Sequence, residues 1–112
     1  MDTTSTGNDT ATNAAQNKTI LVAPGANKRL KLCYAIVYVD TAAVGGGGEV
    51  ALEDGSGGTS IFRADADAEG TFRIDFGKEG YPLSENTVLN LTVDSAVTTQ
   101  ATVTCTALGI IV

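Results

Sequence analysis

The sequence RLKLCYAIVYVD, residues 29–40, reads as a β-strand that changes character halfway along. Successive side chains of a strand point to opposite faces of its sheet. The stretch opens with alternating charged and apolar residues, whereas the residues from Cys33 to Val39 carry no charge on either face. Strict alternation assigns one set to the core of the domain: Leu30, Leu32, Tyr34, Ile36 and Tyr38.

The same alternation leaves a second apolar set that faces away from this core. It consists of Cys33, Ala35, Val37 and Val39. The C-terminal segment, which is uncharged from Ser95 onward, ends in a further apolar group. This group contains Leu108, Ile110, Ile111 and Val112. A contiguous exposed apolar patch on a small protein is typical of an interface. We therefore expect both groups to contact another copy or a different subunit; the alternative is that another part of the chain covers them.

The 112 residues suit one domain, and the pattern around residues 29–40 predicts an all-β fold. Short runs with period-two alternation follow one another along the chain, separated by turn signals such as APGANK and DGSGG. No segment shows a helical period. The sequence predicts a single antiparallel β-sandwich, jelly-roll-like, with seven or eight short strands over residues 18–112.

Residues 1–17 differ from the rest in composition, since they contain no Leu, Ile, Val or aromatic residue. A segment that cannot bury apolar surface is expected to be disordered on its own. We predict an extended, flexible polar arm that is held by a partner, and Thr10 and Asn17 are its expected contact residues.

Composition and charge exclude several functions. The net charge of −6 leaves no basic face for nucleic acid, and no apolar run approaches the roughly 20 residues that span a bilayer. The N-terminus lacks the basic and apolar regions of a secretion signal, so we expect synthesis in the cytoplasm, followed either by use there or by exit through a route without signal cleavage. Without histidine, a Ser–His or Cys–His pair cannot form. The sequence therefore predicts neither an enzyme nor a cofactor.

Two features leave alternatives open. Cys33 and Cys105 have no metal-ligand spacing, and we expect two reduced thiols packed as small apolar side chains, although a disulfide would be feasible on neighbouring strands. In DADAEG, the acidic residues Asp65, Asp67 and Glu69 resemble the start of a calcium loop. The position of the final bidentate Glu is occupied by Phe76, so a turn explains these acids equally well.

The segments ILVAPGANKRLKLCYAIVYVD, EVALEDGSGGTSIF and YPLSENTVLNLTVDSAVTTQATVTCTAL resemble small β-sandwich virion proteins of tailed bacteriophages. These include capsid decoration (cement) proteins and related head-fibre or tail modules. The resemblance covers residues 19–108 and lies in the order of strands and turns. It implies a trimer that binds the major capsid protein on the outside of a virion and stabilises the shell.

A different class of function is a receptor- or glycan-binding module of a phage fibre or tail. Such a module would use Tyr81 and the glycine-rich loop 45–48, because sugar rings stack on exposed aromatic side chains. A cell-surface adhesive sandwich is a further alternative. Native mass and glycan binding distinguish these functions from capsid decoration.

Overall fold

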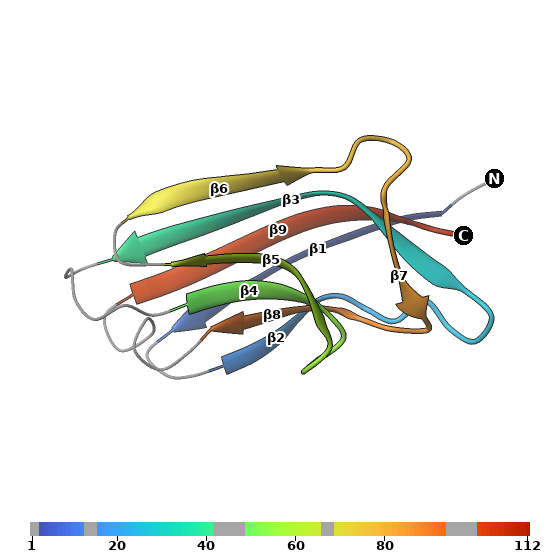
Figure 1. The fold of residues 1–112 in the computed structure, drawn as a ribbon, viewed down its shortest axis with the longest axis horizontal. Helices are drawn as coiled ribbons and strands as arrows, with labels where there is room; N and C mark the ends of the chain where they lie inside the picture. Colours follow the sequence, from blue (N-terminus) through green and yellow to red (C-terminus); the bar gives the residue numbers. More distant parts are fainter. Residues whose placement is uncertain (1–2, 13–15, 42–48, 66–68, 94–100) are drawn as a thin grey trace.

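The computed structural model describes residues 3–12, 16–41, 49–65, 69–93 and 101–112, and every regular element in these ranges is a β-strand (Figure 1). The predicted all-β antiparallel sandwich is confirmed. Sheet A runs in the order β1 (Thr3–Thr12), β9 (Ala101–Ile111), β3 (Arg29–Thr41) and β6 (Gly70–Asp75), and β7 (Tyr81–Glu85) also pairs with β3. Sheet B has the order β2 (Gln16–Leu21), β8 (Leu89–Val93), β4 (Glu49–Asp54) and β5 (Thr59–Asp65).

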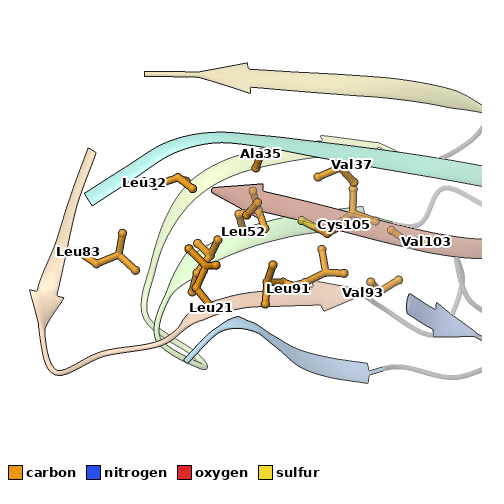
Figure 2. Packing of buried hydrophobic residues seen from close by; sticks show 14 of the residues in the cluster. Leu21, Leu32, Ala35, Val37, Leu52, Leu83, Leu91, Val93, Val103 and Cys105 are labelled. Atoms are coloured by element: carbon orange, nitrogen blue, oxygen red, sulfur yellow. The ribbon is translucent and has the colours of Figure 1, made fainter. Parts of the chain in front are cut away.

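The core lies between the two sheets, and most of it follows the expected alternation (Figure 2). On β4, β8 and β9, apolar residues at alternate positions of the sequence are buried: Val50, Leu52, Leu89, Leu91, Val93, Val103 and Cys105. On β6, the alternate apolar residues Phe72 and Ile74 pack against the margin of this cluster, as does Phe76 just beyond the strand. Period-two patterning therefore identified the inner face of these strands.

On β3 the predicted face is wrong for the second half of the strand. Leu30 and Leu32 are buried as expected, but beyond Cys33 the fully buried residues are Ala35, Val37 and Val39. The register against β9 passes from Leu32–Gly109 directly to Tyr34–Leu108, so Cys33 is an extra residue in a β-bulge. One extra residue reverses every later side chain. Tyr34, Ile36 and Tyr38 consequently point away from the core.

The bulge lies at the point where the strand paired with β3 on the side away from β9 changes from β7 to β6. β7 pairs with β3 from Arg29 to Leu32, and β6 pairs with it from Tyr34 onward. At the junction, the carbonyl oxygen of Cys33 accepts a hydrogen bond from the N–H of Phe76 at 2.8 Å. The segment YPLSE forms strand β7, and its Leu83 is fully buried and belongs to the core cluster.

The N-terminal segment is also different from the prediction. Residues Thr3–Thr12 form β1, which pairs antiparallel with β9 in an unbroken register from Thr3–Ile111 to Thr12–Thr102. From Thr4 to Thr10, where the burial of the side chains is described, no residue belongs to the apolar core cluster. The expectation of a flexible arm is therefore corrected for these residues: main-chain pairing with β9 incorporates a strand that has no large apolar side chain of its own.

Candidate interaction surface

The bulge at Cys33 gives sheet A an outer face with partly exposed apolar side chains. Tyr34 lies opposite Leu108, and Ile36 and Tyr38 follow on the same side of β3. Leu108 and Ile110 occupy the corresponding side of β9, where their inward-facing neighbours Ala107 and Gly109 are buried. Residues two apart on one strand, and residues directly opposite across strands, are neighbours on a sheet. These five residues form one continuous group, here called the apolar strip: Tyr34, Ile36, Tyr38, Leu108 and Ile110.

Charged side chains contact both tyrosines of the strip. The guanidinium carbon of Arg73, on β6, lies 5.5 Å from the ring centroid of Tyr34, within the range of a cation–π contact. The hydroxyl of Tyr38 donates a hydrogen bond to Oε1 of Glu69 at 3.3 Å. Partial burial raises the pKa of Tyr38, and the carboxylates of Asp40 and Glu69 raise it further, so this hydroxyl remains a donor at neutral pH. Tyr38 is still 38% exposed.

Hydroxyl and amide side chains border the strip on the side of β1. The Oγ1 atoms of Thr10 and Thr104 lie 3.0 Å apart, and Nδ2 of Asn8 donates to Oγ1 of Thr106 at 2.6 Å. An apolar centre with a polar, hydrogen-bonding rim is the usual anatomy of a protein–protein interface. The outer face of sheet A therefore has the chemistry of a binding surface.

Three of the predicted contact residues on β3 lie in the core. Ala35, Val37 and Val39 have no exposed surface, so the premise that they face outward is wrong. The physical reason is the face reversal at Cys33 described above. Cys33 itself is half-buried, and its thiol lies 3.9 Å from the carbonyl oxygen of Lys31.

The predicted C-terminal contact residues separate onto different sides of the sheet. Ile110 belongs to the apolar strip, whereas Ile111 packs against the core. Val112 is exposed, and its main chain is tied to Arg29 by a reciprocal pair of hydrogen bonds at 2.9 and 3.0 Å. Of these three residues, Ile110 and Val112 remain candidates for contact with a partner.

The two predicted contact residues of the N-terminal segment are both engaged within the chain. Thr10 pairs with Thr104 across β1 and β9, as described above. Asn17 is exposed on the outer face of sheet B, where its Oδ1 accepts a hydrogen bond from Nδ2 of the buried Asn90 at 3.1 Å. Asn90 also donates to Glu53 at 3.1 Å, so these side chains link β2, β8 and β4. In this structure, Thr10 and Asn17 therefore make contacts that link strands of the same chain.

The calcium candidate receives no support from the part of the chain that is described. Asp67 lies outside the described residues, and Glu69 accepts a hydrogen bond from the hydroxyl of Tyr38. Among the described residues, no group of three or more Asp, Glu, Cys or His side chains is arranged to hold a metal ion. The same ranges contain no helix of the length and apolarity needed to cross a membrane.

The thiols are both free, as expected, and do not approach each other along the sheet. Cys105 lies opposite Val37 on the core side of β9, four pairs away from the bulge that contains Cys33. Burial raises the pKa of the Cys105 thiol to about 12. Cys105 therefore behaves as a small apolar side chain and is not a nucleophile.

Comparisons with known proteins give only distant structural likenesses. No family model matches the sequence, and no curated protein matches it. Among the solved structures, 15 chains match. One comes from work on Bacillus endospore appendages, described as a novel family of disulfide-linked pili, and is 14% identical with a TM-score of 0.48, over 98% of this chain and 86% of that chain.

Strict alternation missed the residues of the strip, apart from Leu108 and Ile110. A signal for it exists in the sequence: from Val103 to Ala107, β9 alternates small apolar residues with threonine, which fixes its inner face without ambiguity. A partner strand must present apolar side chains opposite this inner set. Matching Ala35 and Val37 to Ala107 and Cys105 would have required the extra residue at Cys33.

Proposed function

We propose that this protein is a structural subunit that binds a larger protein assembly through the apolar strip and catalyses no reaction. The observation that carries the proposal is the strip itself. Five apolar or aromatic side chains lie side by side on one sheet face, although the core of the sandwich is complete without them. Burying such a group against a partner removes apolar surface from water, which is the main driving force of association.

The assembly that we propose is the outer surface of a phage capsid, with the major capsid protein as the partner. Support for this choice comes from the resemblance of residues 19–108 to capsid decoration proteins. The fold suits that role, because a rigid sandwich presents a preformed surface and loses little conformational freedom on binding. Many copies bound to one shell would stabilise it collectively, even with a modest affinity at each site.

Co-sedimentation of the purified protein with undecorated capsids tests the proposal. Ile36→Asp places a charge in the centre of the strip and should weaken binding by roughly 100-fold, since a buried unpaired charge costs several kcal/mol. Thr19→Asp is the matched control, because Thr19 is exposed on the outer face of sheet B. Equal binding by both variants and the wild type would show that the strip is not the contact.

A second candidate function is saccharide binding, and one observation favours it. Tyr38 is exposed beside a carboxylate, Glu69, and lies between Thr104 and Thr71 on the neighbouring strands. An aromatic face flanked by hydroxyls and a carboxylate can stack on a sugar ring and hydrogen-bond its hydroxyls. The residue proposed earlier, Tyr81, does not fit this role: its ring packs 5.2 Å from that of Phe76 and against the core, and loop 45–48 lies outside the described residues.

Glycan-array binding distinguishes the two functions. A saccharide site predicts selective glycan binding that Tyr38→Ala abolishes and that Tyr38→Phe, which keeps the aromatic face, retains in part. A capsid-binding subunit predicts no glycan signal, and it predicts that Ile36→Asp and Leu108→Asp are both defective in co-sedimentation.

A further inference from the structure

The strands at the borders of the two sheets differ in how they are protected against pairing with another chain. In the described part of the molecule, β1 is the border of sheet A beside β9, β6 and β7 share the opposite side, and β2 and β5 border sheet B. A border strand exposes unpaired N–H and C=O groups. Proteins block such edges with short strands, charged residues, proline or bulges.

Four of the five border strands carry these features. β2, with six residues, contains Lys18 and a register shift after Thr19. β5 contains Arg63 and pairs with β4 through a register shift. β6 has six residues that include Arg73 and Asp75. β7 has five residues, with Pro82 and a further shift.

β1 lacks them over most of its length. It has ten residues, an unbroken register with β9, and neither proline, lysine nor arginine. Its one charged residue is Asp9, whose Oδ1 accepts a hydrogen bond from the main-chain N–H of Thr10 at 2.8 Å. The carboxylate therefore caps the edge at Thr10, whereas from Thr3 to Asn8 the main chain has no hydrogen-bond partner among the described residues other than β9.

The same hydrogen bond shows which main-chain groups are free. Because the N–H of Thr10 bonds a side chain, Thr10 and Thr104 form a non-hydrogen-bonded pair, the kind that brings side chains close together. The side-chain contacts Thr10–Thr104 and Asn8–Thr106 agree with the assignment of both pairs as non-hydrogen-bonded pairs. Hydrogen-bonded and non-hydrogen-bonded pairs alternate along an antiparallel ladder. Thr4, Thr6 and Asn8 therefore direct both their N–H and C=O groups away from β9, toward the open edge.

We propose that two copies of this chain pair through this edge, with β1 antiparallel to β1 of a second copy and Thr6 opposite Thr6. In this register Thr4 lies opposite Asn8 of the second copy, and the three pairs exchange six main-chain hydrogen bonds. The two Asp9 carboxylates lie at opposite ends of the contact. Only one open edge exists per copy in the described residues, so the contact closes at two copies, in place of the trimer that the phage resemblance implies.

This contact is separate from the apolar strip, but it affects how the strip is presented. A two-fold axis perpendicular to the sheet joins the two copies of sheet A into one continuous sheet. Both strips then lie on the same side of it. Two linked strips would bind a repetitive surface with higher avidity than a single one.

The test uses native mass by light scattering across a concentration series. We expect a dimer for the wild type. Thr6→Pro removes an edge-facing N–H without removing a bond to β9, and should weaken dimerisation on the order of 100-fold or more. Thr6→Val is the matched control and should remain dimeric, because it keeps the main-chain donor. A monomeric or trimeric wild type, or a fully dimeric Thr6→Pro variant that retains the β-sheet circular dichroism of the wild type, would overturn the proposal.

A cross-linking experiment tests the register even if Thr6→Pro folds poorly. In a Cys33→Ser background, Thr6→Cys should form a disulfide-linked dimer under mild oxidation, since directly opposed residues have Cα atoms about 5.5 Å apart. Thr10→Cys is the control, because the two Thr10 positions would be separated by eight residues, about 27 Å. Equal cross-linking of both variants, or none for Thr6→Cys, would contradict this register.

Discussion

Leu32 and Ala35 are both fully buried in the same core, although three positions separate them on one strand. Residues separated by an odd number of positions on a regular strand point to opposite faces. The extra residue at Cys33 reconciles the two observations. It also determines which side chains of β3 are available for binding.

Substitutions at two adjacent positions of β3 should distinguish its inner face from its outer face by their effect on stability. We expect Val37→Asp to prevent folding, or to lower the free energy of unfolding by more than about 3 kcal/mol, because it buries an unpaired carboxylate. Ile36→Asp, one residue away, should cost about 1 kcal/mol because its side chain is half-exposed. Urea denaturation followed by circular dichroism measures both, and the opposite order of stability would refute the face reversal.

Deletion of Cys33 should be tolerated far better than deletion of a neighbour. Without Cys33, Leu32 still points inward and Tyr34 outward, and every later residue keeps its face. The expected cost is about 1–2 kcal/mol, mainly from the lost hydrogen bond between the Cys33 carbonyl and Phe76. Chemical denaturation gives the value.

Deletion of Ile36 is the control for this experiment. It would rotate Val37 and Val39 out of the core, and losing the burial of two valines costs at least about 3 kcal/mol. If the two deletions proved equally destabilising, the bulge would have no special role.

The two thiols should differ sharply in reactivity. Since burial raises the pKa of Cys105 to about 12, we expect one thiol per chain, Cys33, to react with a disulfide reagent at pH 8 in the native state. Both should react in denaturant. Reaction of two thiols in the native protein would show that the core around Cys105 is open.

The pKa of Cys105 also predicts how stability changes at alkaline pH. A raised native-state pKa means that the unfolded chain releases this proton first, near the ordinary value of 9.0. The stabilising contribution is therefore complete below pH 9 and decreases as the pH rises from 9 toward 12. Cys105→Ala should lose less stability than the wild type over this interval, as measured by urea denaturation at each pH.

Gly7 should be essential for docking β1. A Cβ atom at this position would overlap the main-chain carbonyl oxygen of Ile20 on β2, so Gly7→Ala must displace one of the two strands. We expect a loss of about 1–3 kcal/mol and faster hydrogen exchange at the β9 amides that pair with β1. Gly70→Ala is the control, because a Cβ at Gly70 meets no atom within 4 Å. Similar exchange in both variants would mean that β1 does not depend on this close approach.

Sequence reasoning recovered the parts of the fold that local alternation determines. The inner faces of β4, β8 and β9 follow from residues such as Leu52, Leu91 and Val103. The turn signal APGANK coincides with a turn that is closed by the hydrogen bond from the N–H of Lys28 to the carbonyl oxygen of Gly25. The bulge at Cys33 could not be predicted in this way, because apolar residues lie on both sides of it. The pairing that sets its position is a tertiary contact.

β1 escaped prediction for a related reason. Its residues lack large apolar side chains, and its stability comes from main-chain bonds to β9, which composition does not reveal. The candidate surface could not be predicted for both of these reasons: the outer face of β3 was assigned to the core, and β1 was not predicted as a strand. Once Tyr34 and Tyr38 are assigned to the outer face, the strip and the polar border contributed by Asn8 and Thr10 follow directly from the register.

The pairing of Thr3 with Ile111 has a mechanical consequence. It brings the two ends of the described chain to the same end of the sandwich (Figure 1). A tensile load applied between these ends would peel β1 from β9 one rung after another, because antiparallel strands pulled from adjacent ends unzip and do not shear. The domain should therefore yield at low force along this direction whatever its thermodynamic stability. An assembly that carries load through its sheet faces would keep β1, and the edge it offers, intact under strain.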